Sequence, residues 1–458
     1  MRRALILAAG KGTRMKTLIP KCAFPILKKP MIEYQIEALE RANVDEIIVV
    51  VGYKKDVFET LLGSRVIFVY QDEMLGTGHA VMQAKSLLEG KEGDTIILPG
   101  DMPLITAPLV DTLFKAHQEM GSDLTVVSMT QDNPKGYGRI FRDDYGNVKG
   151  IIEEKDCNDM QKQIKEVNTG TYIINNKNLF DALSQVKKND RAGEYYLTDI
   201  VKIMHKAFKV NTFETDNPQE MMGVNTLYQV SFAEKYLRHL INKTMMEVGV
   251  YMVNPSTITI GHSVVIEEGV TILPNTTISG HTVVKKGSTI GPNTELDNAY
   301  IDCDARVNHS LVYNSKIGAN TTVGPFAHVR DQADIGPNNR IGNFVEVKKS
   351  KTGNNTKAVH LSYIGDSIVG EDVNFGCGSI TVNYDGKQKH QTIIGDHVFI
   401  GCNVNLVAPI EVASDSFIAA GSTVTKNVPK GAMAIAREQQ INKEDYAKNF
   451  ISPKKNKK

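Results

Sequence analysis

The sequence predicts two domains of different architecture: an α/β domain with a Rossmann-like mixed sheet, followed by a parallel β-helix. Three observations lead to this prediction. The chain has 458 residues, and about 150 residues is usual for one domain, so two or three domains are expected. Residues 1–227 alternate short apolar segments with helical patterns. Beyond Val250, aliphatic residues instead recur at every sixth position.

The overall composition is that of a folded protein with little net charge. Hydrophobic residues make up 41% of the chain, which is enough for sizeable cores, and the formal net charge is +1. This charge does not indicate a nucleic-acid partner. Only the end of the chain, Ser452–Lys458, is strongly basic, and we interpret it as a solvated chain end.

Cysteine usage and the short apolar runs predict a cytoplasmic protein without an integral membrane segment. The cysteines form no CxxC pair and no metal-like spacing: Cys22, Cys157, Cys303, Cys377 and Cys402. This scattered pattern favours reduced thiols. The first apolar run ends at Gly10, so we interpret it as a strand and a loop rather than a signal peptide. No run approaches the roughly 18 apolar residues of a membrane span.

The first domain is predicted from the alternation of strands and helices. The patterns follow in this order: strand 4–9, helix 31–42, strands 46–53 and 66–70, helix 79–90, strand 94–101, helix 109–120 and strand 123–130. Such alternation implies a mainly parallel sheet with helices on both faces. Ligands of such sheets bind beyond the carboxyl ends of the strands, where the opening loop and Leu98–Pro103 are expected.

A helical pattern at about 225–247 lies where the sequence changes character. It is either a connector between domains or the last helix of the first domain. We favour the connector because the six-residue repeat begins directly after it. We therefore predict a first domain at 1–227, a linker helix at 228–250 and a repeat domain with a C-terminal tail at 251–458.

The second domain is predicted from the six-residue repeat. Its aliphatic positions are Ile260, Ile266, Ile272, Ile278, Val284, Ile290 and Leu296, then Ile317, Val323, Val329, Ile335, Ile341 and Val347, and then Ile394, Ile400, Leu406, Val412, Ile418 and Val424. One inward aliphatic residue per six is typical of a parallel β-helix, in which three units make one triangular coil. The phase is lost at Lys348–Tyr363, and Thr381–Gln391 is an insertion. We expect loops at both breaks, and loops on rigid scaffolds often carry function.

The loop LAAGKGTRMKTLIPK after the first strand has features of a phosphate-binding loop but fits neither common type. Gly10 and Gly12 lack the third glycine of a Rossmann fingerprint, because Met15 stands there, and a Walker A sequence is absent. The glycines allow backbone N–H groups to approach a phosphate or a base edge. Arg14 and Lys21 supply charge that suits a polyphosphate under attack. A plain basic surface loop is the alternative.

Two further side chains are candidates for chemistry. Asp101 follows an apolar strand, where a carboxylate often meets Mg²⁺, although a turn or capping role remains open. His360 lies between Lys348 and Tyr363, in the first break of the repeat. His360 is a candidate general base, with a purely structural histidine as the alternative.

Several short motifs, taken in order, resemble those of sugar-1-phosphate nucleotidyltransferases. They are LAAGKGTRM…PK, QDEMLGTGHA (Gln71–Ala80), PGD (Pro99–Asp101), GYGR (Gly136–Arg139), NTG (Asn168–Gly170) and GVN (Gly223–Asn225). With VEVKK, HLSYIGD and NFGCGSITVNYDGK in the repeat half, nearly the whole chain is similar to the bifunctional N-acetylglucosamine-1-phosphate uridyltransferase/glucosamine-1-phosphate acetyltransferase family of bacteria. The order of the motifs and the domain pairing make this resemblance specific. It implies a nucleotidyltransferase domain followed by a left-handed parallel β-helix of hexapeptide repeats.

The resemblance implies a nucleotide and sugar site in the first domain. The residues implied to bind UTP or UDP-N-acetylglucosamine are Leu7, Ala8, Ala9, Gly10, Lys21, Gln71, Gly76, Thr77, Gly100, Gly138, Glu153, Asn168 and Asn225, with Thr169 on the sugar side. Arg14 and Lys21 would hold the phosphates during catalysis. Asp101 and Asn225 would bind the metal, which is Mg²⁺ in the family. The sugar phosphate is already an anion, so the work is alignment and charge neutralisation as pyrophosphate leaves.

The resemblance implies an acetyl-transfer site in the second domain, with His360 as the proton acceptor. The amino-sugar phosphate would be held by Arg330, Lys348, Tyr363 and Asn374, and acetyl-coenzyme A by Cys377, Asn383, Tyr384, Cys402, Ala420 and Arg437. Cys377 and Cys402 depart from the small or hydroxyl residues that the family often has there, and thiol catalysis is an alternative role for them. Glu346 would either orient the base or be a solvated surface charge.

The implied function is a two-step synthesis of UDP-N-acetylglucosamine for the bacterial cell wall. Acetyl-coenzyme A acetylates glucosamine-1-phosphate, and the product then receives UMP from UTP. One alternative is a single-function sugar-1-phosphate nucleotidyltransferase with a regulatory β-helix, but such a scaffold needs neither His360 nor the NYDGK loop. A non-catalytic assembly subunit is a second alternative, and the presence of Lys21, Asp101 and His360 argues against it. Family members are homotrimers with acetyltransferase sites at subunit boundaries and a C-terminal segment that crosses to a neighbour. The expected partners are therefore small-molecule substrates and further copies of the chain.

Overall fold

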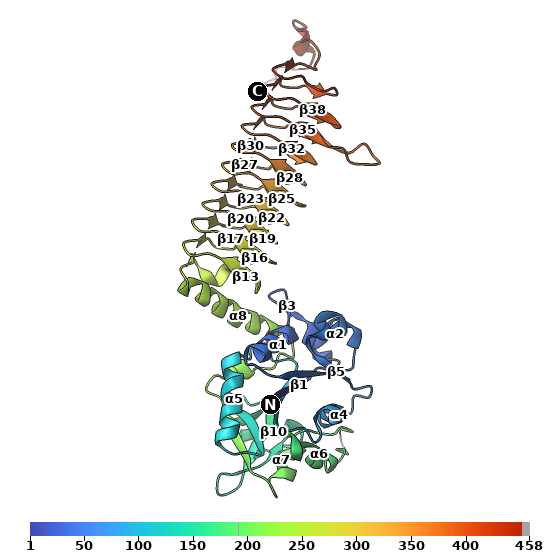
Figure 1. Cartoon of the computed structure of the whole chain (residues 1–458), viewed down its shortest axis with the longest axis vertical. Helices are drawn as coiled ribbons and strands as arrows, with labels where there is room; N and C mark the ends of the chain where they lie inside the picture. Colours follow the sequence, from blue (N-terminus) through green and yellow to red (C-terminus); the bar gives the residue numbers. More distant parts are fainter. Residues whose placement is uncertain (191, 451–458) are drawn as a thin grey trace, which may run out of the picture. The chain divides into compact units, whose positions relative to one another are not determined.

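The structure is a computed structural model that describes residues 1–190 and 192–450 (Figure 1). It divides into two compact units, Met1–Arg238 and His239–Lys458, and each is described by itself. The boundary falls inside helix α8 (Leu227–Glu247), which overlaps the linker helix expected at 228–250. The exact domain limits stay a prediction, and the basic segment Ser452–Lys458 lies outside the described residues.

A mixed β-sheet with helices on both faces forms the first unit. The strands of this sheet are β1 (Arg2–Leu7), β4 (Glu46–Val51), β5 (Ile67–Tyr70), β6 (Asp94–Pro99), β7 (Leu124–Thr130), β8 (Arg139–Arg142), β9 (Val148–Ile152), β10 (Glu166–Asn175) and β11 (Val210–Glu214). A separate two-stranded sheet is formed by β2 (Pro25–Ile26) and β3 (Lys29–Pro30). The helices of this unit are α1 (Met31–Arg41), α2 (Lys55–Leu62), α3 (Thr77–Met82), α4 (Lys85–Leu88), α5 (Ala107–Glu119), α6 (Asn176–Ser184) and α7 (Asp199–Met204). The main strand order is β11-β7-β10-β6-β1-β4-β5. Neighbouring strands are parallel except β10, which runs antiparallel to β6 and β7.

Alternate residues of β1 enter two separate cores, which confirms the prediction of helices on both faces. Ala4 and Ile6 pack in one core with buried side chains of α1, α2 and α5. Leu5 packs in the other core with side chains of α3, α6 and α7. A strand buried on both faces needs a continuous apolar run, which is how β1 reads. Within the described part of the chain, no helix has both the length and the apolar character needed to cross a membrane.

The carboxyl ends of the parallel strands meet at one edge of this sheet. β1 ends at Leu7, and β6 ends at Pro99, directly before Gly100 and Asp101. β10 runs the other way, so the beginning of β10 lies at the same edge. Asn168 in this part of β10 pairs with Ser128, close to the carboxyl end of β7. Loops from segments far apart in the sequence therefore converge here, as expected for such sheets.

The second unit is a parallel β-helix made of three sheets, each named here after its first strand (Figure 1). The β12 sheet contains β12 (Tyr251–Met252), β15 (Thr271–Ile272), β18 (Thr289–Ile290), β21 (Arg306–Val307), β24 (Thr322–Val323), β27 (Arg340–Asn343), β30 (Lys357–His360), β33 (Asn374–Phe375), β36 (Phe399–Ile400), β39 (Phe417–Ile418) and β41 (Met433–Ala434). The β13 sheet contains β13 (Thr259–Ile260), β16 (Thr277–Ser279), β19 (Glu295–Asp297), β22 (Leu311–Tyr313), β25 (His328–Arg330), β28 (Glu346–Lys348), β31 (Tyr363–Gly365), β34 (Ile380–Val382), β37 (Asn405–Val407) and β40 (Thr423–Val424). The β14 sheet contains β14 (Val265–Ile266), β17 (Val283–Val284), β20 (Tyr300–Ile301), β23 (Lys316–Ile317), β26 (Asp334–Ile335), β29 (Lys351–Thr352), β32 (Ser367–Val369), β35 (Thr392–Ile394) and β38 (Ile410–Val412).

The predicted aliphatic positions form the interior of this β-helix. Ile260, Ile278 and Leu296 are completely buried and stack directly on one another in the β13 sheet, one per coil. The corners between sheets need tight turns, and Asn275 and Asn293 there have φ values of 58° and 50°. Asn tolerates this left-handed conformation better than most residues, which explains the recurring Asn between the aliphatic positions.

The predicted break at Lys348–Tyr363 is wrong, because the coils continue through this segment as β29, β30 and β31. The inward positions are taken by Thr352 and Ala358, which are buried but are not large aliphatic residues. The Thr352 hydroxyl is satisfied inside the β-helix, where it accepts a hydrogen bond from Asn339 Nδ2 at 2.7 Å. The insertion predicted at 381–391 is observed as a loop between β34 and β35.

Candidate functional site

A cavity of about 530 Å³ opens at the carboxyl edge of the first unit's sheet. Most of the residues predicted for the nucleotide and sugar site line it: Leu7, Ala9, Gly10, Lys21, Gln71, Gly76, Thr77, Gly100, Asp101, Glu153 and Asn168. Four further predicted residues are not part of the lining: Ala8, Arg14, Gly138 and Asn225. Ala8 is buried behind the wall, and the Gly138 carbonyl accepts a hydrogen bond from the backbone N–H of Asn168 at 2.8 Å. The structure therefore brings most of the predicted residues together around one cavity, and their roles stay predictions.

The glycine loop brings its backbone against Lys21. Gly12 has a φ of 61°, and a Cβ at Gly12 would lie 2.5 Å from the Lys21 Cβ. A Cβ at Gly10 would meet no atom within 4 Å. Gly12 is thus the glycine required by close approach within the protein, while Gly10 leaves open space in the cavity wall.

Four polar side chains converge where the glycine loop faces the end of β6. Lys21 Nζ forms an ion pair with Asp101 and donates a hydrogen bond to Asn225 Oδ1 at 3.0 Å. Arg14 Nη2 donates to the same Asn225 oxygen at 2.6 Å. The fold thus brings together the opening loop, the end of β6 and the segment before α8. The first and last of these segments lie more than 200 residues apart in the sequence.

The oxygens of Asp101 and Asn225 suit a hard divalent cation. A carboxylate and an amide oxygen are ligands that Mg²⁺ accepts, and Mg²⁺ usually takes only one or two protein ligands beside water and substrate phosphates. Gly223 leaves the space between them free, since a Cβ there would lie 3.6 Å from Asp101 Oδ1 and from Asn225 Nδ2. Among the residues that the structure describes, no cluster of three or more His, Cys, Asp or Glu side chains could hold a metal. These two ligands fit a cation whose remaining coordination positions are filled by water and substrate phosphates.

Gln35 of α1 holds the loop that carries Asp101. Its side chain is completely buried, and Nε2 donates hydrogen bonds to the carbonyls of Pro99 at 2.7 Å and Met102 at 3.1 Å. These carbonyls flank Gly100 and Asp101 on both sides. Helical periodicity alone places Gln35 on an apolar helix face, so the sequence did not indicate this contact.

The residues predicted for the sugar site contact β10 and the segment before α7. Asn168 Nδ2 donates a hydrogen bond to Tyr172 Oη at 2.7 Å. Glu153 accepts one from Thr198 Oγ1 at 3.1 Å, and burial raises the pKa of Glu153. Thr169 differs from the expectation, because its hydroxyl donates to the Val127 carbonyl at 2.8 Å and so supports the sheet.

Sequence reasoning missed a wall of the cavity that is built from Glu194, Leu197 and Thr198. This segment is tied to the motif Gln71–Ala80, because the backbone N–H of Gly78 donates to the Tyr195 carbonyl at 2.8 Å. A Cβ at Gly76 would lie 2.7 Å from the same carbonyl oxygen. The two glycines of GTG were the available signal that another segment packs closely there.

In the second unit, His360 belongs to a row of residues that we call the corner column: Asn343, His360, Cys377, Cys402 and Ala420. Each stands where the chain passes from the β12 sheet to the β13 sheet. Asn343 pairs with His360 in register, and the last four stand two residues after the paired positions Ala358, Phe375, Ile400 and Ile418. Predicted base and predicted coenzyme residues therefore share one line, with one residue per coil.

The neighbours of His360 give Glu346 a contact that differs from both roles expected for it. His360 is exposed, and its Nδ1 lies 2.9 Å from Asn343 Oδ1. Glu346 is engaged elsewhere, since it accepts from Arg330 Nε at 2.8 Å and lies 2.7 Å from Arg330 Nη2. Glu346 therefore positions the predicted phosphate-binding Arg330, and Asn343 contacts the base.

The predicted amino-sugar residues lie beside the corner column on the β13 sheet. Arg330 and Lys348 are neighbours in register on β25 and β28, and Tyr363 follows on β31. The insertion adds Lys389, which sequence reasoning missed; a hydrogen bond with Lys389 lowers the pKa of Lys348. Asn374 lies instead on the outer face of the β12 sheet, in register with Phe399.

The insertion at 381–391 is a closed hairpin. Tyr384 and Lys389 form an antiparallel bridge, and His390 Nε2 lies 2.7 Å from Asp385 Oδ2. Asn383 is buried at its base, where Nδ2 donates to Tyr363 Oη at 3.2 Å and to Asp366 Oδ2 at 2.6 Å. The hairpin thus links a predicted coenzyme residue, Asn383, to a predicted sugar-phosphate residue, Tyr363.

The remaining predicted coenzyme residues lie farther along the corner column. Cys377 is partly exposed and Cys402 is exposed. Arg437 approaches from the segment after β41, since a Cβ at Gly421 would lie 3.5 Å from Arg437 Cδ. These residues line an open surface of the β-helix.

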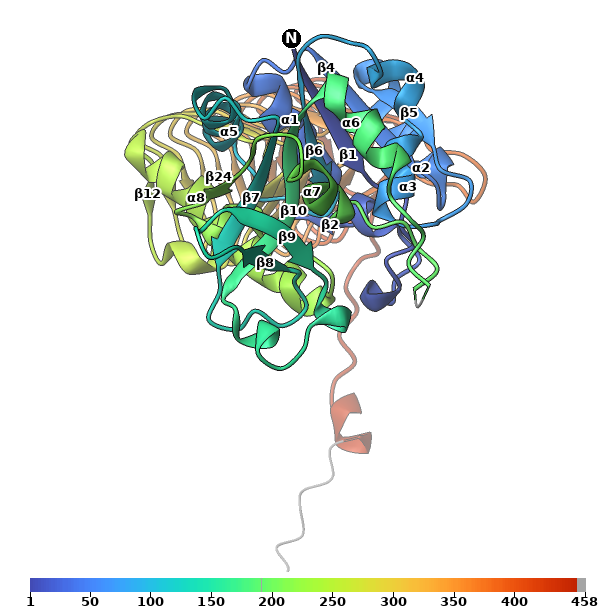
Figure 2. The same cartoon turned by 90° about the horizontal axis from the view of Figure 1, so that it is seen from below.

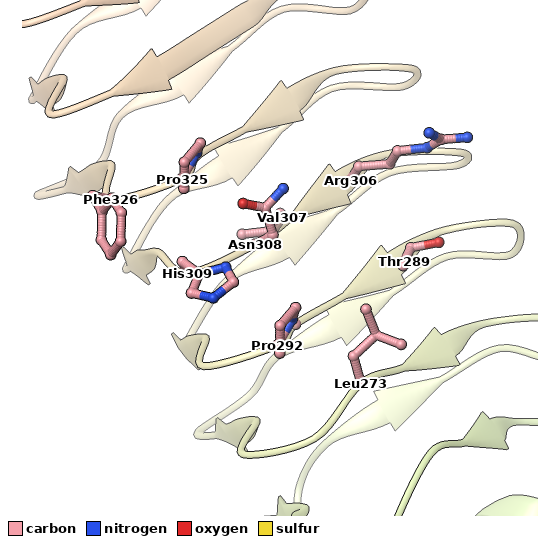
Figure 3. A pocket seen from close by; sticks show the side chains of 10 residues that line it. Leu273, Thr289, Pro292, Arg306, Val307, Asn308, His309, Pro325 and Phe326 are labelled. Carbon is pink, nitrogen blue, oxygen red and sulfur yellow. The ribbon is translucent and has the colours of Figure 1, made fainter.

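Another cavity of the β-helix, of about 500 Å³, contains none of the predicted residues (Figure 3). Pro292, Pro325 and Phe326 give it an apolar wall, and Arg306 stands at its border. His309 also lines it, but this histidine has no paired set of charges beside it in the lining, so the cavity does not change the assignment of the two candidate sites.

Comparisons with known proteins cover both halves of the chain. Residues 3–217 match the family described as nucleotidyl transferase, and residues 314–349 and 391–426 match bacterial transferase hexapeptide (six repeats). A curated relative named "Bifunctional protein GlmU" from Acholeplasma laidlawii is 59% identical and covers 98% of this chain and 98% of its own length. Relatives with the same name from an Exiguobacterium species and from Listeria monocytogenes are 46% and 43% identical, and each covers 98% of this chain and 98–99% of its own length.

Proposed function

This chain belongs to the family of bifunctional GlmU proteins, and we propose that it performs the two transfers that end in UDP-N-acetylglucosamine. The β-helix acetylates glucosamine-1-phosphate with acetyl-coenzyme A. The nucleotidyltransferase unit then joins UMP from UTP to N-acetylglucosamine-1-phosphate and releases pyrophosphate. Two separate clusters of reactive side chains, one in each unit, support this assignment.

In the acetyl transfer, His360 acts as the general base. The amino nitrogen of the substrate attacks the thioester carbonyl, the C–S bond breaks, and the nitrogen loses a proton to the imidazole. Arg330 and Lys348 hold the substrate's phosphate by charge-assisted hydrogen bonds, and Lys389 adds a further positive charge. The thiol of coenzyme A leaves along the corner column.

In the uridyl transfer, the residues of the first cavity align two anions. An oxygen of the sugar phosphate attacks the α-phosphorus of UTP, and the bond to the pyrophosphate breaks. Lys21 and Arg14 neutralise the phosphate charge, and no general base is needed because the attacking oxygen is already ionised. A divalent cation held by Asp101 and Asn225, for which we propose Mg²⁺, supplies further charge neutralisation when bound.

The observation that carries the proposal of a second activity is the set of polar contacts around His360. Arg330 is held by Glu346, Tyr363 is bonded to Asn383, and His360 contacts Asn343. A regulatory β-helix would need none of these contacts beside an exposed histidine. The single-function alternative is therefore the weaker one.

A homotrimer fits the open acetyl-transfer surface. His360 is exposed, and the C-terminal segment, which is still bonded to the coils at Ala436, then runs away from them (Figure 2). Its apolar side chains Ile441 and Phe450 are 81% and 74% exposed. A neighbouring copy would cover these side chains and exclude water from the base. A cytoplasmic location remains our prediction.

One assay tests both activities. The protein is incubated with glucosamine-1-phosphate, acetyl-coenzyme A, UTP and Mg²⁺, and coenzyme A and pyrophosphate are followed separately. We expect both products, loss of coenzyme A release in His360→Ala, and loss of pyrophosphate release in Asp101→Ala. Pyrophosphate release that occurs only with N-acetylglucosamine-1-phosphate would support the single-function alternative, and neither product would support a non-catalytic subunit.

A further inference from the structure

We infer that Asn343 is a positioning residue for acetyl transfer: its side-chain oxygen holds Nδ1–H of His360, so that Nε2 is the nitrogen that accepts the substrate's proton. This inference rests on the proposed acetyltransferase function and deepens it. The contact joins Asn343 Oδ1 and His360 Nδ1 at 2.9 Å.

The backbone is built to keep these two residues side by side. Asn343 and His360 end β27 and β30, and the register pairs them directly. These strands are four residues long, whereas β24 and β33 on either side have two residues. The longer strands thus extend the pairing between β27 and β30 up to Asn343 and His360 and no further.

A glycine makes this extension possible. Gly342 is buried, and a Cβ at this position would collide with the carbonyl oxygen of Val359. The close approach of Gly342 to Val359 brings the next residues of both strands, Asn343 and His360, into contact. The Leu361 N–H then donates to the Asn343 carbonyl at 3.0 Å, which fixes the backbone of both residues.

The contact decides which imidazole nitrogen is basic. A neutral imidazole has one N–H donor and one acceptor nitrogen, and the hydrogen bond made by one nitrogen sets the role of the other. Because Asn343 offers its oxygen, Nδ1 carries the hydrogen and Nε2 keeps its lone pair. When Nε2 takes the substrate's proton, the Nδ1–H bond to Asn343 persists, so the charged imidazolium remains supported.

The other charged and polar groups near His360 are engaged with different partners. Glu346 is paired with Arg330, and Asp366 accepts from Asn383. Ser362 donates to the His360 backbone carbonyl and not to the ring. Asn343 is therefore the side chain that orients the ring, and as a neutral amide it does so without adding a negative charge.

The test measures kcat, KM and the pH dependence of acetyl transfer in Asn343→Ala and Asn343→Asp. We expect the alanine variant to lose about 10-fold in kcat with little change in either KM, because general-base catalysis is weakened while substrate binding remains. The aspartate variant keeps an oxygen acceptor and should recover much of kcat. Its negative charge favours the imidazolium, so the acidic limb of the pH–kcat profile should move to higher pH.

Controls separate this inference from the proposed function and from misfolding. Asn354→Ala removes a comparable bond between coils, from Asn354 Nδ2 to Glu371 Oε1 at 3.1 Å, and should leave acetyl transfer unchanged. Uridyl transfer and the melting temperature report on folding, and if the alanine variant is unstable the aspartate profile decides the question. Unchanged kcat and pH profiles in folded Asn343 variants, with His360→Ala inactive, would overturn the inference alone. A wild-type protein without acetyl transfer would overturn the proposed function.

Discussion

Lys21 Nζ lies 3.0 Å from Asn225 Oδ1, and the same ammonium group is ion-paired with Asp101. The cation predicted to hold phosphate therefore occupies the oxygens predicted to hold the metal. A metal bound by these oxygens would compete with Lys21 until the phosphates of a nucleotide provided Lys21 with another partner.

We predict that Lys21→Met abolishes uridyl transfer and yet strengthens binding of a divalent cation in the absence of nucleotide. The reason is that Asp101 and Asn225 lose a competing positive charge. Titration with Mn²⁺, followed by electron paramagnetic resonance, measures this affinity independently of turnover. Lys16→Met, an exposed residue of the same loop, is the matched control and should leave Mn²⁺ affinity unchanged. Weaker Mn²⁺ binding in Lys21→Met would contradict the competition.

Gln35→Leu should lower kcat of uridyl transfer several-fold and raise the Mg²⁺ concentration needed for half-maximal activity. The change leaves the carbonyls of Pro99 and Met102 without their donor, at a cost of about 1–3 kcal/mol in unfolding free energy. The loop that presents Asp101 then loses its anchor. Steady-state kinetics over a range of Mg²⁺ and a urea melt measure the two effects. Gln118→Leu, on an exposed face of α5, should show neither effect, and acetyl transfer should be unaffected in both variants.

The pair Lys348 and Lys389 predicts a pH dependence of substrate binding. Because the hydrogen bond with Lys389 lowers the pKa of Lys348, Lys348 loses its charge at a lower pH than an ordinary lysine. KM for glucosamine-1-phosphate should therefore begin to rise at a pH below the usual lysine range. In Lys389→Met the pKa of Lys348 rises again, so the increase in KM should begin at a higher pH. At neutral pH the variant should have a larger KM than the wild type, because one positive charge at the site is lost. Lys387→Met is the control for a change elsewhere in the hairpin. An identical pH dependence of KM in Lys389→Met and wild type would contradict the coupling between Lys348 and Lys389.

Thiol alkylation should separate the two activities. Cys402 is exposed on the corner column, whereas Cys22 is buried at the uridyl cavity and burial raises its pKa to about 12. N-ethylmaleimide at neutral pH should thus stop acetyl transfer while uridyl transfer continues. A variant with both Cys377→Ala and Cys402→Ser should be active before treatment and should keep acetyl transfer after it. Equal loss of both activities, or rapid labelling of Cys22 in peptide maps of the folded protein, would refute this prediction.

The sequence predicted the fold well because both of its patterns report burial directly. Apolar strands such as β1 and the aliphatic positions from Ile260 onward are buried as expected. The pattern failed at Thr352 and Ala358, where a hydrogen bond and a small side chain fill the interior in place of an aliphatic group. A periodicity search counts hydrophobic residues and does not count a satisfied hydroxyl.

The candidate site was predictable where a motif names its residues and not where a contact depends on tertiary packing. Lys21, Asp101 and Asn225 converge as the resemblance implied. Gln35 was hidden because a buried amide on an apolar helix face has no sequence signature. Asn343 was hidden as well, because its role depends on the register between two coils and on the space left by Gly342.

The corner column also spaces its residues at regular intervals along the β-helix. Each coil advances the chain by about 4.8 Å, so the distance from His360 to Ala420, three coils on, is about 14 Å. For a coenzyme bound along this line, the number of coils between His360 and the residues that hold its far end would decide where its reactive end lies. Loss or gain of one whole coil between them would preserve the folded interior and would shift the predicted coenzyme contacts by one step relative to His360.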